Sequence, residues 1–186
     1  MSHILLGVSA SVACYKACDL ASKLAQAGHE VRAVLTPRAA EMVSPQLFQA
    51  VTGERAATSE WGPERAGAMD HIDLARWSDC LVVAPCTADL AARLALGTAG
   101  DLLTTLALAT EPHKPRLLCA AMNPIMFRNP AVQRNLGQLA EDGWELVEPD
   151  SGHMACGEDG QGRLADPEHI AERVFERLGR ASKGEV

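Results

Sequence analysis

Three side chains in this sequence have the chemistry of an acid–base or ligand-holding site: Cys156, His71 and Asn123. Cys156 lies in SGHMACGEDGQGRL (151–164), which has neither helical nor strand periodicity and whose glycines permit close backbone approach. Long ordered loops in compact domains tend to be functional, so this segment can fold over a ligand, although taken alone it is slightly more typical of a solvated surface loop with an incidental thiol. Histidine titrates near neutral pH, which suits proton transfer, and asparagine can donate to a carboxylate without adding charge.

Small and hydroxyl-bearing residues follow the first three expected strands. The first strand runs into SASVACYK (9–16), where the first N–H groups of a helix can hold a phosphate. Thr36 adds a hydroxyl after the second strand, and Thr87 and Asp89 follow the third, where they can cap a helix or face a bound ring system. The sequence has no Gly-x-Gly-x-x-Gly motif and no P-loop. Taken alone, the first turn is equally typical of a mononucleotide phosphate site and of an ordinary serine N-cap.

Nearly continuous apolar strands alternate with helical segments along the chain. Strands are expected at 3–8, 30–36, 81–84, 116–121 and 145–147, and helices at 11–27, 88–96, 101–109, 130–142 and 167–178. This alternation predicts an α/β fold: a three-layer α/β/α, Rossmann-like (flavodoxin-like), doubly wound parallel sheet in a single domain of residues 1–186. Ligands of such folds bind beyond the carboxyl ends of the strands, where strand order reverses. The segments at Thr36, Thr87 and Asn123 all follow expected strands, which places them at that edge.

Composition limits the classes of protein to consider. The formal net charge of -7, without a Lys/Arg run, argues against a general nucleic-acid surface, and no apolar run is long enough to cross a bilayer. The six cysteines form no Cys-x-x-Cys pair and mostly lie in apolar segments. No signal peptide is visible, so we expect a reduced, cytoplasmic protein without a metal site. The polar tail at 180–186 is expected to fray.

Together, these segments resemble the homo-oligomeric flavin-containing cysteine decarboxylases. The resemblance extends from 7 to 164 and is carried by four motifs in order: GVSASVACYK, the histidine of HIDLARWSD, APCTADLAARLALGTAGDLLT, and AMNPIM followed by ACGEDGQGRL. It is strongest to the branch that acts in coenzyme A biosynthesis. This resemblance implies an enzyme, a carboxy-lyase, that uses FMN to convert 4'-phosphopantothenoylcysteine to 4'-phosphopantetheine by thiol oxidation, CO2 loss and enethiol reduction.

The resemblance also implies roles for individual residues. His71 would assist thiol deprotonation, Asn123 would hold the substrate carboxylate, and Cys156 would deliver a proton during the reduction. The residues implied in FMN binding are Ser9, Ala10, Ser11, Thr36, Thr87, Ala88, Asp89 and Ala121. The residues implied in substrate binding are Met122, Asn123, Met126, Ala155 and Gly157, the last two in a mobile substrate clamp at 148–165.

Members of this family assemble into trimers, sometimes grouped into dodecamers, with the flavin site shared between neighbouring subunits. The resemblance therefore implies a homo-oligomer with its site at a subunit interface. Bifunctional relatives continue into a phosphopantothenoylcysteine synthetase domain, so such a domain or a separate synthetase is a further expected partner. Neither nucleic acid nor a membrane is expected as a partner.

Three other interpretations differ in the residues that they require. A peptidyl-cysteine oxidative decarboxylase of peptide-antibiotic maturation generally lacks the clamp cysteine, which is present here as Cys156. A flavin prenyltransferase is disfavoured by MNPIM and by the ACGEDGQGRL segment. A non-catalytic regulatory binding module would be favoured by the loss of His71, Asn123 or Cys156, and all three are present.

Overall fold

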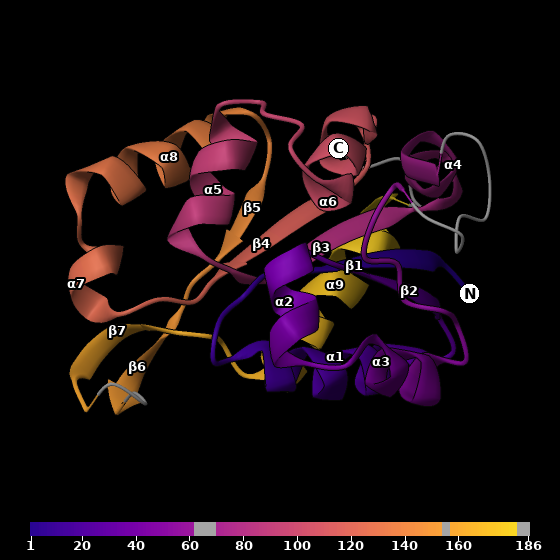
Figure 1. The fold of residues 1–186 in the computed structure, drawn as a ribbon, viewed down its shortest axis with the longest axis horizontal. Helices are drawn as coiled ribbons and strands as arrows, with labels where there is room; N and C mark the ends of the chain where they lie inside the picture. Colours follow the sequence, from indigo (N-terminus) through magenta and orange to yellow (C-terminus); the bar gives the residue numbers. More distant parts are fainter. Residues whose placement is uncertain (62–69, 154–156, 182–186) are drawn as a thin grey trace.

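The structure is a computed structural model that describes residues 1–61, 70–153 and 157–181. At its centre lies a five-stranded sheet in the order β2-β1-β3-β4-β5 (Figure 1), and all its strand pairs are parallel. The strands are β1 (His3–Val8), β2 (Glu30–Leu35), β3 (Cys80–Cys86), β4 (Arg116–Ala120) and β5 (Glu145–Val147). The direction of chain progression reverses between β1 and β3, so the carboxyl ends of these two strands mark the switch point at which such folds bind ligands.

Helices cover both faces of the sheet, which confirms the three-layer α/β prediction. One face carries α1 (Cys14–Gln26), α2 (Pro37–Met42), α3 (Pro45–Thr52) and α9 (Pro167–Ala181). The other carries α4 (Asp70–Trp77), α5 (Ala88–Ala95), α6 (Leu102–Ala109) and α8 (Pro130–Glu141). Helix α9 includes Arg180 and Ala181, which were expected in the frayed tail, and 182–186 lie outside the described residues. Within the described chain, no helix combines the length and apolarity that crossing a membrane requires.

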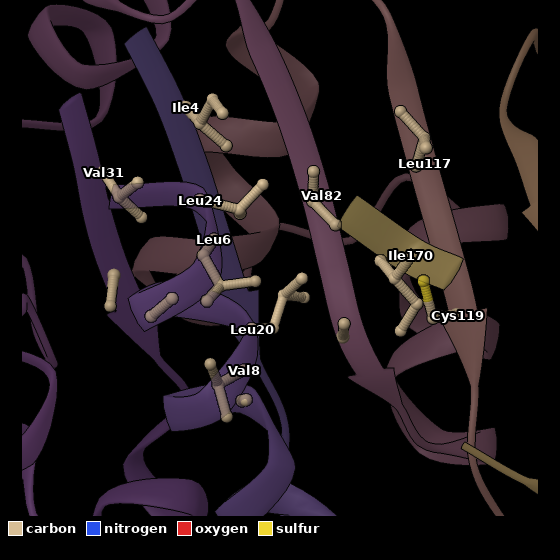
Figure 2. Close-up of a cluster of buried hydrophobic side chains, with 14 of the residues drawn as sticks. Ile4, Leu6, Val8, Leu20, Leu24, Val31, Val82, Leu117, Cys119 and Ile170 are labelled. Carbon is tan, nitrogen blue, oxygen red and sulfur yellow. The ribbon is translucent and has the colours of Figure 1, made fainter. Parts of the chain in front are cut away.

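Alternate side chains of the strands enter separate cores on the two faces. Figure 2 shows Ile4, Leu6 and Val8 of β1 beside Leu20 and Leu24 of α1, and all five are almost completely buried. Leu5, which follows Ile4 in β1, faces the opposite core, under α5, α6 and α8. Since both faces are covered, β1 and β3 are apolar along nearly their whole length, and the polar groups that can face a ligand lie at the strand ends.

Five helices of the described chain begin with a polar cap residue followed by proline, including the short α7 (Pro124–Phe127). In each, the cap side chain accepts a hydrogen bond from a backbone N–H two or three residues further along the chain. Proline is favourable at the first helical position because its missing N–H would have no intrahelical partner. The five cap and proline pairs are Thr36-Pro37, Ser44-Pro45, Asn123-Pro124, Asn129-Pro130 and Asp166-Pro167. Helices α2, α3 and α7 were not predicted: α2 and α7, with six and four residues, are too short to show a hydrophobic period, and the Ser44-Pro45 start of α3 was not used.

The segment expected to be an irregular clamp loop, 148–165, instead contains an antiparallel hairpin of β6 (Asp150–His153) and β7 (Asp159–Arg163). The hairpin is attached to the chain after β4, where the Met122 N–H donates to the Gly162 carbonyl at 2.9 Å. Gly160 has a φ of +155° and lies against Pro124 of α7, so that an added Cβ would be 3.0 Å from the Pro124 Cβ. The glycines of the β6–β7 hairpin hide its strand pattern in the sequence. Residues 154–156, between the two strands, lie outside the described residues.

The edge strand β5 is fastened to α9 by an ion-pair cluster around Glu145. This carboxylate is 12% exposed and accepts hydrogen bonds from Arg173, at 2.5 Å from Nη2, and from Arg177. Burial opposes its ionisation, but the hydrogen bonds from Arg177 and Arg173 dominate and lower the pKa of Glu145 below its usual value. A carboxyl whose pKa is lowered by folding stabilises the protein above its unfolded pKa, and loses that contribution as pH falls through the folded value.

We therefore expect Glu145→Gln to lower the free energy of unfolding at neutral pH by about 1–2 kcal/mol, since a charged hydrogen-bonded pair is replaced by a neutral one. The difference from wild type should shrink as pH falls below about 4.3, the usual pKa of a glutamate. Urea unfolding at several pH values measures this. Glu176→Gln is the matched control, because Glu176 also pairs with Arg173 but is 52% exposed. If Glu145→Gln lowered the free energy of unfolding equally at neutral and acidic pH, the ion pairs of Glu145 would not be the source of this pH-dependent stability.

Candidate active site

At the switch point, one hydroxyl ties the carboxyl ends of β1 and β3 together. Ser9 is 2% exposed, and its Oγ donates to the Pro85 carbonyl at 2.8 Å and accepts from the Thr87 N–H at 3.0 Å. The Ser9 N–H also donates to the Pro85 carbonyl, at 3.2 Å. The Ser9 hydroxyl is therefore engaged in hydrogen bonds that hold the turn together. The groups that this turn can present to a ligand are those of its backbone.

The turn between β1 and α1 has the features of a phosphate-binding turn. Ala10 and Ser11 are partly exposed, and the Ser11 Oγ accepts from the Ala13 N–H at 3.3 Å. No side chain caps the N-terminus of the 13-residue helix α1, which begins after Ala13. An uncapped helix start beside small residues can hold a phosphate monoester through backbone N–H groups and the helix dipole. The donor set therefore fits the phosphate of a mononucleotide cofactor.

Two further predicted cofactor residues are helix caps at the same edge of the sheet. Thr36 is 4% exposed, and its Oγ1 accepts from the Ala39 N–H at 3.2 Å at the start of α2. The Thr36 N–H donates to the carbonyl of Val8, the last residue of β1. Thr87 caps α5 in the same way, accepting from the Leu90 N–H at 3.3 Å. Both threonines thus lie next to the β1 turn.

The remaining predicted cofactor residues differ in exposure. Ala88 opens α5, and Ala121 is 4% exposed and donates its N–H to the Cys86 carbonyl at 2.9 Å. The Asp89 side chain is 70% exposed and accepts from the Arg93 Nε at 3.1 Å. The structure therefore gathers the predicted cofactor residues around the ends of β1, β2, β3 and β4.

Asn123 joins the chain after β4 to the β6–β7 hairpin. Its Oδ1 accepts from the Ile125 N–H at 2.8 Å and from the Met126 N–H at 3.4 Å, which caps α7. Its Nδ2 donates to the Glu158 Oε2 at 2.6 Å. Because Oδ1 is held by the helix start, the orientation of the amide is fixed and its N–H groups face the hairpin.

The other predicted substrate residues surround this amide in the sequence. Met122 is 9% exposed and precedes it, whereas Met126 is 48% exposed on α7. Gly157 is exposed, with a φ of +84°, and immediately precedes Glu158. Ala155 and Cys156 lie outside the described residues.

His71 was expected just before a helix and is instead the second residue of α4. Its Nδ1 lies 3.0 Å from the Glu60 Oε2, within hydrogen-bonding distance, and the two side chains are only 25% and 19% exposed. Figure 1 shows α4 at one end of the molecule, and α7 with the β6–β7 hairpin at the other. A single chain therefore does not bring His71 together with Asn123.

The cysteines of the described chain are neutral thiols. Burial raises the pKa of Cys80, Cys86 and Cys119 far above the usual value for a thiol. Burial also raises the pKa of Cys14 and Cys18. Because the thiolate is the reactive form, these five free cysteines are poor nucleophiles at neutral pH.

Two carboxylates that the sequence analysis did not select contact predicted site residues. Glu158 belongs to the ACGEDGQGRL motif, but an acid in a polar segment carries no local signal of its partner. Glu60 is separated from His71 by 62–69, and no helical or strand spacing relates the two. Both pairings depend on tertiary structure, and sequence spacing alone could not have found them.

With this geometry established, comparison with known families identifies the class of protein. The family model described as Flavoprotein matches residues 1–179. The chain belongs to this flavoprotein family.

Curated relatives include two proteins named coenzyme A biosynthesis bifunctional protein CoaBC. The Haemophilus influenzae protein is 45% identical over 168 residues, which cover 90% of this chain and 42% of the relative. The Bacillus subtilis protein is 43% identical over 176 residues, 93% of this chain and 43% of the relative. The chain therefore spans less than half the length of these bifunctional relatives.

Solved structures of similar proteins cover the whole fold. A Cys-to-Ser variant of PPC decarboxylase, complexed with pantothenoylaminoethenethiol, is 31% identical with a TM-score of 0.84, over 94% of this chain and 97% of that one. The FMN-dependent cysteine decarboxylase SpaF is 32% identical with a TM-score of 0.82, over 98% of each chain. The FMN binding protein AtHal3 is 31% identical with a TM-score of 0.80, over 94% of this chain and 95% of that one. These matches confirm both the predicted fold and the predicted family.

Proposed function

We propose that this chain is the FMN-dependent decarboxylase that converts 4'-phosphopantothenoylcysteine to 4'-phosphopantetheine in coenzyme A biosynthesis. The observation that carries this proposal is the likeness to PPC decarboxylase over nearly the full length of both chains. The CoaBC relatives support the same pathway. A synthetase domain or a separate synthetase is the proposed partner. The free cysteines of the described chain are compatible with action in a reducing cytoplasm.

When bound, FMN would supply two-electron oxidation and reduction. Oxidation of the substrate thiol provides an electron sink for the bond that breaks when CO2 leaves. The FMN phosphate would be held by Ser9, Ala10 and Ser11 at the start of α1, next to Thr36. The fit rests on the uncapped helix N-terminus and on the neutral, small residues of that turn. Thr87, Ala88, Asp89 and Ala121 would lie nearer the flavin ring.

The substrate would be held beside the hairpin. The Asn123 amide is fixed by α7 and would donate to the substrate carboxylate. Met122 and Met126 would supply adaptable apolar walls, and Ala155 and Gly157 would contribute backbone from the clamp segment. Cys156 would protonate the enethiol during its reduction.

The site would be completed by a second copy of the chain, in a trimer or dodecamer. Two observations support this assembly. His71 and Asn123 lie at opposite ends of one molecule (Figure 1), so His71 would have to come from a neighbour. Ile125 and Met126 are 63% and 48% exposed beside Asn123, and apolar side chains exposed at a functional site indicate a contact surface.

Within the assembly, we assign Glu60 as the residue that positions His71. If the Glu60 carboxylate accepts the Nδ1 proton, the ring presents Nε2 as the atom that takes the substrate thiol proton. Carboxylates orient histidine bases in this way, because they fix both the tautomer and the ring direction and stabilise the protonated ring.

We expect Glu60→Gln to lower kcat by about tenfold to a hundredfold with little change in KM, since loss of the orienting carboxylate removes only part of the roughly hundredfold to ten-thousandfold that general-base assistance contributes. The pH profile of kcat/KM should shift as well, because the charge next to the base is lost while an acceptor oxygen remains. Glu54→Gln is a matched control, as it removes an acid of the same region that pairs with Arg32. An unchanged kcat and pH profile in Glu60→Gln would show that the pair is only structural.

The proposed function is tested by comparing CO2 release from phosphopantothenoylcysteine with that from a peptide ending in cysteine. We expect turnover of the pantothenoyl substrate and little or none of the peptide. The reverse preference would assign the chain to the peptide-modifying branch. The likeness to SpaF, described as an FMN-dependent cysteine decarboxylase, is the reason to include this alternative. Flavin binding without CO2 release from either compound would favour a non-catalytic regulatory binding module.

A further inference from the structure

The donor that the proposed function assigns to the substrate carboxylate already holds a carboxylate of the protein itself. The Glu158 Oε2 lies 2.6 Å from the Asn123 Nδ2, the distance of a strong hydrogen bond to a charged acceptor. We propose that Glu158 is an internal competitor of the substrate's carboxylate, which must displace it from the Asn123 amide in order to bind. This inference rests on the proposed role of Asn123.

The contact is built into the fold by attachments on both sides of Glu158. On one side, Asn123 is held by its own α7 cap. On the other, β7 follows Glu158 directly and is fastened to the same segment by the bond between the Met122 N–H and the Gly162 carbonyl. Gly160, also in β7, packs closely against Pro124, and its φ of +155° together with this close approach favours glycine there. The hairpin thus delivers Glu158 to Asn123 as a consequence of how it docks.

The chemistry of the two carboxylates makes them exclusive or mutually repulsive. Glu158 and a substrate carboxylate are both acceptors without a proton to share when ionised. If the substrate takes the same amide hydrogen, Glu158 must leave. If it takes the second hydrogen of Nδ2, two like charges lie next to each other, which disfavours the complex. In both arrangements the negative charge of Glu158 weakens the binding of substrate.

The product has lost the carboxylate, so it does not compete with Glu158. Loss of CO2 therefore allows Glu158 to return to the Asn123 amide without displacing the product's own groups. The Glu158–Asn123 contact therefore lowers the affinity for the substrate, which carries the carboxylate, and leaves the affinity for the product unchanged. The apparent substrate affinity is consequently the intrinsic affinity multiplied by the fraction of molecules in which Glu158 is not bound to Asn123.

The test compares Glu158→Gln and Glu158→Ala with wild type, each purified with its flavin. Glutamine keeps an acceptor oxygen for Asn123 but removes the charge, and alanine removes both. Substrate dissociation constants are measured on a His71→Asn background, so that binding is read without turnover, and the product phosphopantetheine is measured in parallel. Glu141→Gln, which removes an exposed carboxylate from the neighbouring helix α8, controls for net charge.

We expect both Glu158 variants to bind phosphopantothenoylcysteine about threefold to tenfold more tightly, with product affinity and the Glu141→Gln control unchanged. If Glu158 instead served to orient Asn123, alanine would weaken substrate binding while glutamine would not, and the proposal would be overturned. Unchanged substrate affinity in both variants would also overturn it. Failure of the wild-type protein to bind phosphopantothenoylcysteine at all would refute the proposed function instead, which keeps the two failures distinguishable.

Discussion

His71→Asn is expected to abolish decarboxylation while the protein keeps its flavin. Asparagine cannot take a proton at neutral pH, so the general base is lost, and kcat should fall by about a hundredfold to ten-thousandfold. The predicted flavin residues lie at the strand ends, on elements other than α4, so the visible flavin spectrum should be unchanged. His113→Asn is the control, because His113 is 68% exposed and pairs with Glu111, and neither is a predicted site residue. Turnover at the wild-type rate would remove His71 from the mechanism.

The same variant tests whether the site is shared between chains. His71→Asn subunits retain an intact Asn123, and Asn123→Asp subunits retain an intact His71. If a site draws these residues from two neighbours, dissociating and remixing equal amounts of the two variants should restore about a quarter of wild-type activity when substrate is kept well below the raised KM of Asn123→Asp, since each residue is intact with a chance of one half. A site confined to one chain would recover nothing.

Asn123→Asp is expected to raise the KM for phosphopantothenoylcysteine by about a hundredfold, because like charges placed together at a binding site cost several kcal/mol. Aspartate caps a helix as well as asparagine does, so α7 should still form through the bonds to Ile125 and Met126.

Asn129→Asp is the matched control for this change. Asn129 caps α8 with the same geometry, accepting from the Ala131 N–H at 2.9 Å, but has no predicted role in the site. Both variants should keep the capped helix start, whereas only Asn123→Asp should lose affinity for substrate. Unchanged substrate affinity in Asn123→Asp would rule out contact between this amide and the carboxylate.

The sheet and its main helices were predictable because their signals are local. β1 and β5 have the predicted bounds, and the predicted starts of α5 and α8 are those observed. The β6–β7 hairpin was missed, since its glycines carry no side chain to reveal a strand's alternation, and its conformation depends on docking against Pro124. Helices α2 and α3 were missed although Thr36-Pro37 and Ser44-Pro45 are start signals that could have been used.

The predicted site residues were selected by motif, but their geometry required the structure. No sequence pattern indicates that the Ser9 hydroxyl points into the β1–β3 junction, or that His71 lies far from Asn123 in one chain. The hydrogen-bonding partners of His71 and Asn123 are also distant in the sequence. Glu60 contacts His71 from a separate segment. Glu158 contacts Asn123 only because the hairpin folds back on α7. Such pairings are set by tertiary packing, which spacing in the sequence does not encode.

The most direct test of the proposed function is the mass of the product formed when the purified protein, its flavin verified by visible absorption, is incubated with phosphopantothenoylcysteine. The proposal predicts saturated phosphopantetheine, lighter than the substrate by one CO2 and with no net oxidation. A product that has lost CO2 but remains an enethiol would contradict the reductive half of the cycle and the role of Cys156. Unconverted substrate in the presence of bound flavin would contradict the assignment as a whole.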